Sequence, residues 1–465
     1  MQAILTFLGS QLILLVGIAL GISLVVYILL QRYTPQVTIA WLLAIVFLPY
    51  IGVPLYLLLG GRKVHQTIAK KGWLDLREMD LPVSEGTGPI RRLLRTYGLP
   101  GPSARNELEL LGTGVMAYQR LVDLIDQANI SIHISIFVYS KDAVARDIRD
   151  HLCAKAAAGV QVRILLDGVG SLHTHRRFFR KLIKAGGQVA YFIPLLRRPL
   201  RGRTNLRNHR KIILIDDTCV WSGGRNIGVE YLGPTPLTDQ WRDLSFMLYG
   251  SAVAHYSEVF RADWAFAAHE SLNPIISPPP SKHPLSVDTI VQVVPSGPDL
   301  PHDALYDAII SMAFNAQERL WIVTPYFVPD HPLAQALEIA ARRGVDVRIL
   351  VPERSNHLLA DLVRGCYLRE LQSAGAKVYL YTPGMLHAKL LIKDDDLAMI
   401  GTANMDVRSL FLDYEIAALF YDAESIRQVE AWTQETLQDC RLGVAEVSMP
   451  RRIFEGALHI VAPVV

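Results

Sequence analysis

A motif that occurs twice constrains this chain more than any other feature of its sequence. It reads H-x-K-x-x-x-x-D, and its two copies lie in "NHRKIILIDD" (208–217) and "LHAKLLIKDD" (386–395). The copies place three residues in register, namely His209, Lys211 and Asp216 in the first and His387, Lys389 and Asp394 in the second. One such match arises easily by chance, but two copies in one chain indicate an internal duplication.

Other segments repeat at a similar offset of roughly 180 to 190 residues. "AAAGVQVRILLDGVGS" (156–171) corresponds to "AARRGVDVRILVPERSN" (340–356), and each predicts a helix that ends at glycine and leads into a β-branched strand. A turn and an asparagine follow each motif, Asn226 in "WSGGRNIG" and Asn404 in "MIGTANMD". Apolar runs alternate with amphipathic segments in both halves, so we expect a duplicated α/β unit whose sheet is flanked by helices.

The first sixty residues are apolar enough to enter a membrane. Residues 12–30 and 38–59 carry no charged side chain, and each is near the roughly 20 residues that a bilayer-spanning helix needs. A secretory signal peptide explains the first stretch less well, because it lacks a basic leading region and a second apolar stretch follows at once. Four cations follow the second stretch, Arg62, Lys63, Lys70 and Lys71, so the positive-inside rule places everything after residue 60 in the cytoplasm.

Charge is concentrated locally rather than spread over the chain. The formal net charge is only +3, which gives no overall signature of nucleic-acid binding. Residues 195–211 nevertheless hold seven basic residues and no acid, and they lead directly into the first motif. We expect this segment to dock on an anionic membrane surface through its arginines, Arg197, Arg198, Arg201, Arg203 and Arg207.

The duplicated motif is suited to phosphodiester chemistry. In a strand, His and Lys two residues apart point to the same face, so each copy presents an imidazole beside an ammonium group. A phosphodiester oxygen needs cations and neutral donors, which Lys211, Lys389, Asn226 and Asn404 supply. Cleavage needs a nucleophile and an acid, and two histidines fill both roles when one is neutral and the other protonated. A strand with an exposed polar end would explain one copy as well, but the second copy disfavours that explanation.

At these residues the chain resembles the phospholipase D superfamily, and specifically the bacterial cardiolipin synthases. The resemblance extends from "PLYLLLGGRK" through "RNHRKIILID", "SGGRNIGVEYL", "WRD", "VVPSGPD" and "TPYFVPD" to "HAKLLIKDD" and "GTANMDVRS". It implies an α/β fold of two tandem phospholipase D-like repeats, with a mixed β-sheet flanked by helices, preceded by a two-helix transmembrane hairpin. The expected parts are the hairpin at 1–60, a juxtamembrane linker at 61–110, the first repeat at 111–272, a proline-rich linker at 273–286 and the second repeat at 287–465.

The resemblance also implies an activity. It is transphosphatidylation, in which two phosphatidylglycerol molecules give cardiolipin and glycerol through a phosphatidyl-histidine intermediate, without a metal or other cofactor. The expected partners are phosphatidylglycerol, cardiolipin and an anionic membrane surface, with no nucleic acid. The expected location is the bacterial cytoplasmic (inner) membrane, as a multi-pass protein with its catalytic repeats facing the cytoplasm. The sequence leaves open the oligomeric state, the acyl-chain preference and the choice of nucleophile.

Residue roles carry over from the family to the matching positions. His209 and His387 are the expected nucleophile and acid, with precedent for the first as nucleophile. Lys211, Lys389, Asn226 and Asn404 are expected to bind the phosphate. Asp243 of "WRDLSF" and Glu415 of "DYEIAA" match carboxylates that orient a catalytic histidine. Asp216 and Asp394 complete the catalytic motifs, and we expect them to hold the motif strands.

Two positions depart from the family pattern. Ser135 in "SIHISIFVYS" stands where a glutamate is usual, and Asp413 in "LDYE" stands where an asparagine is usual. These changes bear on the choice of headgroup or acceptor. A phospholipase D-type hydrolase, or a synthase that uses another phospholipid or alcohol acceptor, is therefore the alternative function.

More distant functions fit the sequence less well. A nuclease would want stacking aromatics beside its basic groove, and residues 195–211 contain none. A non-catalytic membrane receptor would be expected to have lost a motif His or Lys, and none is missing. His173 and His175 lack an acid or cysteine at metal-ligand spacing, so we expect them on a loop exposed to solvent or headgroups. Trp241 is expected to be a packing residue.

Overall fold

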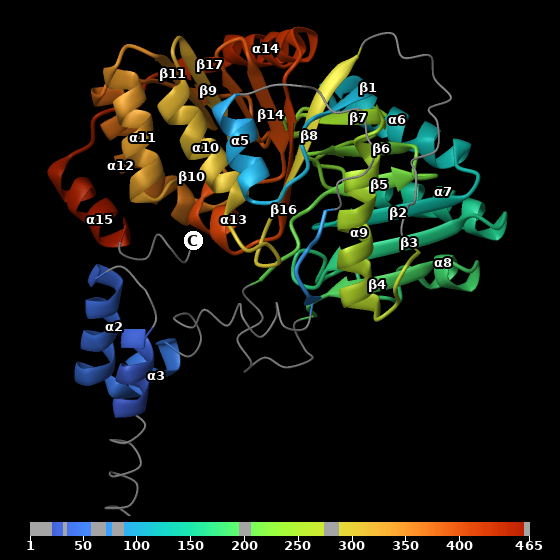
Figure 1. Cartoon of the computed structure of the whole chain (residues 1–465), viewed down its shortest axis with the longest axis horizontal. Helices are drawn as coiled ribbons and strands as arrows, with labels where there is room; N and C mark the ends of the chain where they lie inside the picture. The colour runs from blue at the N-terminus through green and yellow to red at the C-terminus, as the bar shows by residue number, and fades with distance from the viewer. Residues whose placement is uncertain are drawn as a thin grey trace, which may run out of the picture. The chain divides into compact units, whose positions relative to one another are not determined.

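The computed structural model describes residues 21–30, 35–56, 71–76, 88–194, 206–273 and 288–459 (Figure 1). The chain forms two compact units, one comprising Met1–Gln66 with Arg198–Thr204, the other comprising the rest. Residues 274–286 of the expected proline-rich linker and 195–205 of the basic segment lie outside the described residues.

The N-terminal unit contains apolar helices that pack on one another. Residues 21–30 are helical, and α2 (Pro35–Phe47) and α3 (Pro49–Leu55) follow. The second expected span is interrupted, because Leu48 leaves helical geometry directly before Pro49, with φ −132° and ψ 58°. The rings of Trp41 and Tyr56 then meet edge to face with centroids 5.2 Å apart. Within the described residues, no helix combines the length and the apolar character needed to cross a membrane.

The second unit is built on one sheet whose strand order is symmetric. The order is β17-β12-β11-β9-β13-β14-β16-β8-β1-β7-β6-β5-β2-β3-β4, and matching strands of the two repeats lie at equal distances from the β8/β1 pair. The first repeat supplies β1 (Ser103–Leu111), β2 (Ser131–Ile136), β3 (Gln161–Asp167), β4 (Gln188–Phe192), β5 (Ile212–Ile215), β6 (Cys219–Gly223) and β7 (Ser245–Gly250). The second supplies β8 (Thr289–Ser296), β9 (Arg319–Val323), β11 (Asp346–Pro352), β12 (Lys377–Tyr381), β13 (Leu390–Lys393), β14 (Leu397–Gly401), β16 (Glu415–Phe420) and the edge strand β17 (Cys440–Leu442).

The sheet is mixed, as the resemblance implies. Strands β2, β3 and β4 run parallel, as do β9, β11 and β12, while the strands nearer the centre pair antiparallel. Strand β1 pairs with both β7 and β8, so residues 103–110, which the sequence assigns to the linker, lie within the sheet. A separate short sheet joins β10 (Phe327–Val328) to β15 (Met405–Asp406).

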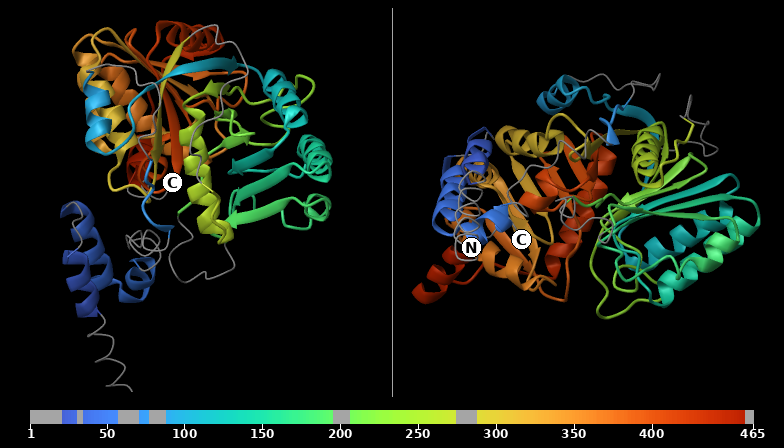
Figure 2. Two further views of the ribbon diagram at one scale, coloured as in Figure 1. Left: turned by 45° about the vertical axis from the view of Figure 1, so that its right-hand side comes forward. Right: turned by 90° about the horizontal axis from the view of Figure 1, so that it is seen from below.

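Helices cover both faces of the sheet (Figure 2). In the first repeat, α7 (Ala143–Ala157) and α9 (Val253–Ala268) lie on opposite faces of the sheet. Buried aliphatic side chains of β2, β3 and β5 pack against α6 (Gly114–Gln127) and α7. The remaining helices are α5 (Pro89–Thr96), α8 (Arg180–Lys184), α10 (Ala304–Asn315), α11 (His331–Arg342), α12 (Leu358–Ser373), α13 (Val407–Phe411), α14 (Ala423–Gln438) and α15 (Met449–His459).

The repeated glycines have the role that the sequence predicts for them. Gly159 follows α7 with φ 92°, and Gly344 follows α11 with φ 90°. Only glycine adopts this left-handed conformation without a steric penalty, so each helix ends there and the chain enters β3 or β11. The internal repeat is therefore a repeat of structure as well as of sequence.

Candidate active site

The two motifs meet at the junction of the repeats. His209 and Lys211 directly precede β5, and His387 and Lys389 directly precede β13, the matching strand of the other half. Each histidine segment bonds to the backbone of the opposite repeat. The N–H of His209 donates to the carbonyl of Tyr414 at 2.9 Å, and the N–H of His387 donates to the carbonyl of Arg242 at 2.7 Å.

A carboxylate holds each imidazole, and it comes from the other repeat. The Nδ1 atom of His209 lies 2.9 and 3.1 Å from the two carboxylate oxygens of Glu415. The Nδ1 atom of His387 lies 2.7 Å from Oδ2 of Asp243. An ionised carboxylate accepts a hydrogen bond, so each ring turns a protonated Nδ1 towards its carboxylate, and Nε2 is the nitrogen on the other side of the ring.

The motif lysines lie against the same histidines. Lys211 Nζ donates to the carbonyl of His209 at 2.9 Å, and Lys389 Nζ donates to the carbonyl of His387. Lys389 Nζ also lies 2.8 and 3.0 Å from the two ring nitrogens of His387. All four side chains are nearly or fully buried, so their charges act in a medium of low polarity.

Burial sets the protonation of the site. It lowers the pKa of His209 to about 4 and that of His387 to about 3, although the carboxylates oppose the shift. It also lowers the pKa of Lys211 to about 8 and that of Lys389 to about 7. Both imidazoles are therefore neutral at pH 7 in this state. A bound phosphodiester anion raises the pKa of all four groups, because a nearby negative charge favours the protonated forms.

The two carboxylates stay ionised beside the histidines. Burial by itself raises the pKa of Asp243, but the hydrogen bond from His387 and the nearby Lys389 bring it below its ordinary value. The pKa of Glu415 is lowered in the same way by His209 and Lys211, against the effect of burial. Each pair therefore consists of a neutral imidazole and a charged carboxylate.

The two predicted asparagines follow β6 and β14 and are buried. Asn226 accepts a hydrogen bond from the Val138 N–H at 3.1 Å. Asn404 donates through Nδ2 to Ser409 Oγ at 3.1 Å, and its Oδ1 has no hydrogen-bond partner among the described residues. A buried amide oxygen without a partner is costly in a folded protein, and such groups concentrate at functional sites.

Aromatic rings stand against both histidines. The Phe137 ring meets that of His209 edge to face at 4.7 Å, and the rings of Tyr231 and Trp241 lie 5.3 and 5.2 Å from that of His387. Trp241 packs against the core, as expected, and also against the candidate site. Sequence reasoning missed Phe137 and Tyr231, because an aromatic in a strand or loop is far more often a core residue.

A buried ionic cluster that the sequence gave no sign of lies behind His209. Lys71 Nζ lies 2.5 Å from a carboxylate oxygen of Asp263 and 2.5 Å from one of Asp299. Arg210 contacts the same two carboxylates at 2.8 and 3.3 Å. Asn208 donates to Asp263 at 2.9 Å. Two cations thus balance two buried carboxylates, as burial of charge requires.

This cluster is directly connected to the candidate site. Arg210 is the residue between His209 and Lys211, and its Nε donates to the backbone carbonyl of Glu415 at 3.1 Å. It therefore holds both the histidine segment and the backbone of the carboxylate that contacts the histidine. Through Lys71, the segment 71–76 is joined to this wall of the site.

Asp413, the departure from an expected asparagine, is buried and has a raised pKa. Its Oδ1 accepts from the Arg207 N–H at 3.2 Å, and Arg408 Nε donates to its Oδ2 at 3.2 Å. Burial raises its pKa well above the ordinary value, against the effect of Arg408. Burial therefore favours the neutral form of this carboxyl, whereas the ion pair with Arg408 favours the charged form. Ser135, the other departure, is buried in β2.

Asp216 and Asp394 do not lie beside the histidines. They follow β5 and β13, at the opposite ends of the strands that the histidines precede. Asp216 accepts from the N–H groups of residues 129–131 at 2.7 to 2.9 Å, and Asp394 accepts from those of residues 317–319 at 2.8 to 3.1 Å. These bonds fix the turns that lead into β2 and β9.

Only residues 206–211 of the basic segment are described, and Arg207 among them does not have the expected role. Arg207 is 2% exposed, and its guanidinium lies 3.4 Å from Asp167 and 3.2 Å from the carbonyl of Ile193. It therefore packs inside the fold and was wrongly included among residues that dock on a membrane. Arg197, Arg198, Arg201 and Arg203 lie outside the described residues.

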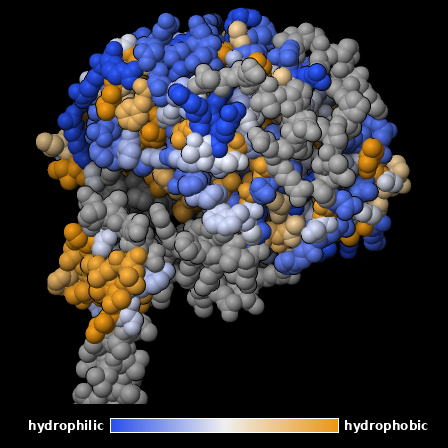
Figure 3. Space-filling view, in the orientation of Figure 1, coloured by the Kyte–Doolittle hydropathy of each residue, from blue (hydrophilic) through white to orange (hydrophobic). Residues whose placement is uncertain are grey.

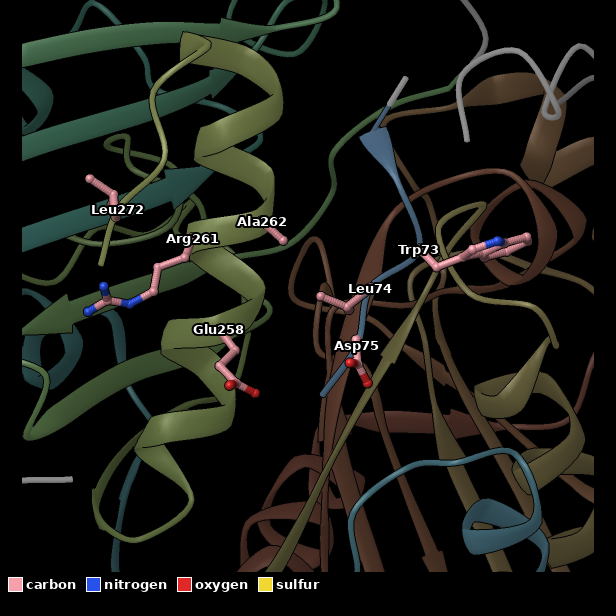
Figure 4. A pocket seen from close by; sticks show the side chains of 7 residues that line it. All are labelled: Trp73, Leu74, Asp75, Glu258, Arg261, Ala262 and Leu272. Atoms are coloured by element: carbon pink, nitrogen blue, oxygen red, sulfur yellow. The ribbon is translucent and has the colours of Figure 1, made fainter. Parts of the chain in front are cut away.

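The described part of the chain includes His173 and His175, and it contains a cavity away from the two motifs. His173 and His175 are exposed, and no group of three or more His, Cys, Asp or Glu side chains there is arranged to hold a metal ion. A cavity of about 260 Å³ lies between the segment 71–76 and α9, lined by Trp73, Leu74, Asp75, Glu258, Arg261, Ala262 and Leu272 (Figure 4). None of the predicted site residues lines it.

Comparison with known proteins identifies the family. A family model described as "Cardiolipin synthase, PLD-like domain" matches residues 121–264 and 309–437, which cover the two halves of the site. The chain is 33% identical to cardiolipin synthase 1 of Bacillus anthracis over 470 residues, with 95% of this chain and 91% of the relative covered. This chain belongs to the cardiolipin synthase family. A model described as "Phospholipase_D-nuclease N-terminal" also matches residues 19–61.

Other members of the cardiolipin synthase family are similar over almost the whole chain. Cardiolipin synthase A of Pseudomonas aeruginosa is 35% identical over 443 residues, covering 92% of this chain and 89% of the relative. The major cardiolipin synthase of Bacillus subtilis is 33% identical over 479 residues, covering 98% and 99%. Among solved structures, phosphatidylserine synthase of Haemophilus influenzae aligns with a TM-score of 0.61 and 17% identity, over 81% of this chain and all of that chain. That likeness shows the fold alone.

Proposed function

We propose that this member of the cardiolipin synthase family joins two phosphatidylglycerol molecules into cardiolipin and releases glycerol. The names of its relatives and the geometry of the site support this reaction. The observation that carries it is the crossed pair of imidazoles, each held at Nδ1 by a carboxylate and each accompanied by a lysine.

In the first step, Nε2 of one neutral histidine attacks the phosphorus of phosphatidylglycerol. The bond from phosphorus to the glycerol oxygen breaks, and the other histidine, protonated when the anion binds, gives its proton to the leaving glycerol. The product on the protein is a phosphatidyl-histidine. We assign the two roles to His209 and His387, with His209 as the preferred nucleophile.

In the second step, the histidine that gave up its proton acts as a base. It takes the proton of a headgroup hydroxyl of a second phosphatidylglycerol, whose oxygen attacks phosphorus as the bond to the nucleophilic histidine breaks. Cardiolipin leaves, and the proton inventory of the site is restored. The reaction written in this way uses no metal or other cofactor.

The remaining site residues act on charge and orientation. Lys211 and Lys389, with Asn226 and Asn404, bind the phosphate oxygens and stabilise the charge that develops on them. Asp243 and Glu415 hold the histidines in the tautomer that exposes Nε2 and stabilise the imidazolium that forms. Asp216 and Asp394 position the motif strands.

One assay separates this function from its alternatives. Purified full-length protein in detergent micelles with phosphatidylglycerol as the only lipid should form cardiolipin and glycerol in equal amounts. Phosphatidic acid in place of cardiolipin would indicate a phospholipase D-type hydrolase, and no product without another alcohol would indicate a different acceptor. His209→Ala and His387→Ala should each remove nearly all activity, because the two groups act as a unit.

We also propose that residues 1–60 are a membrane-embedded hairpin, and that the residues after 60, with both repeats, lie on the cytoplasmic side of a bacterial inner membrane. The first repeat then begins with β1 (Ser103–Leu111) rather than at residue 111. The charge-free stretches and the exposure of apolar side chains such as Ile22, Leu30 and Phe47 support this placement. Cysteine labelling in intact cells tests it: a cysteine placed in the repeats should react only with a membrane-permeant reagent. Reaction with an impermeant one would contradict the proposed orientation.

A further inference from the structure

The last helix of the described chain, α15, turns one carboxylate inward. Glu455 is 1% exposed and accepts hydrogen bonds from Arg369 of α12 and, at 2.9 Å, from Arg451. Gly365 of α12 lies opposite this carboxylate, since a Cβ there would be in van der Waals contact with both of its oxygens, at 3.4 Å. An ion pair therefore attaches α15 to the second repeat.

The outer side of α15 is apolar. Met449 and Ile453 are each 68% exposed, and Phe454 is 54% exposed. A helix on the surface of a soluble protein normally turns its large apolar side chains towards the core. Exposed apolar side chains over α15 are visible at the left edge of the molecule in Figure 3. The exposure of three large apolar side chains on one helix indicates a partner for this side.

The start of α12 adds to the same surface. Leu358 and Leu359 are 72% and 51% exposed, at the beginning of the helix against which α15 packs. Just before them, Asn356 accepts a hydrogen bond from Tyr326 Oη at 2.5 Å, and the His357 ring lies 5.2 Å from that of Tyr326. Tyr326 is near enough to Tyr231 to affect its pKa, and Tyr231 packs against His387. The two exposed leucines are thus linked to the candidate site through two tyrosines.

The chemistry of this surface fits a lipid bilayer. Arg451 and Arg452 flank the apolar side chains and pair with Glu455 and Glu446. Their side chains are still 57% and 52% exposed, as suits the boundary between anionic headgroups and acyl chains. Residues 460–465, which follow α15, carry no charged side chain. A second protein copy would equally bury apolar groups, but it gives no reason for the surface to adjoin a site that takes its substrates from a membrane.

We propose that α15 and the first turn of α12, through Met449, Ile453, Phe454, Leu358 and Leu359, form a docking surface that lies among the headgroups and upper acyl chains of a phosphatidylglycerol-containing bilayer. This surface holds the candidate site beside its lipid substrate. In naming bilayer lipid as the partner, the inference rests on the proposed function. It concerns a surface of the second repeat and is separate from the N-terminal hairpin.

Depth measurement tests the docking without reference to activity. Full-length protein carrying Ile453→Cys, with the half-buried Cys153, Cys366 and Cys440 changed to Ser, is labelled with bimane and placed in phosphatidylglycerol vesicles. Lipids with a nitroxide on the acyl chain should quench this label strongly. Ile130→Cys is the matched control, because Ile130 is 65% exposed but lies in the first repeat, before β2. Its label should not be quenched.

Two results would overturn the docking. The first is equal, weak quenching at positions 453 and 130. The second is protection of the label at 453 from aqueous iodide without nitroxide quenching, which would mean that protein, such as a second copy, covers the surface.

Kinetics connect the docking to the reaction. The double variant Met449→Gln/Ile453→Gln should raise the apparent KM for vesicle phosphatidylglycerol several-fold while leaving kcat/KM for monomeric dihexanoyl-phosphatidylglycerol unchanged. Ile130→Gln is the control. An unchanged apparent KM in vesicles would contradict a role for the surface in catalysis. Absence of cardiolipin from the wild type would defeat the proposed function, while the quenching result would still decide the docking.

Discussion

The crossed histidine–carboxylate pairs predict which variants share a defect. Asp243 belongs to the first repeat but contacts His387, and Glu415 belongs to the second but contacts His209. Asp243→Asn should therefore resemble a weakened His387 variant, and Glu415→Gln a weakened His209 variant. A site organised within each repeat would give the opposite pairing.

The expected size of the defect follows from the burial of these contacts. The carboxylates of Asp243 and Glu415 are completely buried, and their bonds to the imidazoles measure 2.7 and 2.9 Å. A hydrogen bond to a charged group contributes about 1.5–3 kcal/mol. This corresponds to a loss in kcat/KM of roughly 10- to 150-fold. Stabilisation of a wrong histidine tautomer by the new amide would increase the loss towards about 10⁴-fold.

An activated substrate separates the two histidines. Phosphatidyl-p-nitrophenol has a leaving group that departs without a proton, so the first-turnover burst of nitrophenolate needs the nucleophile and not the acid. With His209 as nucleophile, Asp243→Asn and His387→Ala should keep most of the burst rate, while Glu415→Gln and His209→Ala lose it. With the roles exchanged, the pattern reverses but the pairs remain the same.

The reasoning is refuted if Asp243→Asn follows His209→Ala on the activated substrate. Each variant must also unfold at the wild-type temperature in a thermal melt, since a defect caused by lost structure carries no information on the pairing. Asp216→Asn is a useful further control, because Asp216 bonds backbone amides at the other end of β5.

Three further outcomes follow from the charges of the site. Because burial lowers the pKa of Lys389 to about 7, kcat/KM should fall as the pH rises through neutrality and this lysine loses its charge. Lys389→Arg should move this fall to higher pH. If the fall stays at the same pH, another group is responsible for it. Lys71→Met leaves Arg210 alone with two buried carboxylates, so it should lower the free energy of unfolding by about 3–5 kcal/mol and also lower kcat. Lys71→Arg should retain most of the stability and of kcat. A stable, fully active Lys71→Met variant would show that the ion pairs of Lys71 are dispensable. Asp413→Asn keeps the size of the side chain and removes an acid whose charged form burial disfavours, so it should leave kcat nearly unchanged. A large loss would mean that Asp413 acts as a carboxylate.

The fold and the four motif residues could be predicted because their signals are local and occur twice. The glycines that end α7 and α11, and the spacing of His209 and Lys211, are short patterns that the second repeat reproduces. The partner of each histidine could not be read in this way. Asp243 and Glu415 occupy matching positions, so the sequence is equally compatible with pairing within a repeat and pairing between repeats.

The residues that sequence reasoning missed act through contacts between distant segments. Lys71 contacts Asp263 and Asp299, which are 192 and 228 residues away in the sequence. No periodic pattern in the sequence predicts a contact over such a distance. Arg207 was wrongly assigned to the membrane-docking segment for a related reason. It is part of a basic run in the sequence, but the backbone N–H of the next residue, Asn208, donates to the buried Asp167. This contact between distant segments places the end of the run inside the fold.

The junction of the repeats also limits how the enzyme can move. Strands β1 and β8 pair across it, and the backbone bridges Asn208 to Tyr414 and Arg242 to Leu386 cross it at the histidines. Opening the halves like a hinge would break these bonds together. The two histidines are therefore held together without domain closure. Under the proposed mechanism, lipid enters and leaves past a preformed pair of histidines. Exchange of lipid, rather than motion of the two halves, would then limit the rate of turnover.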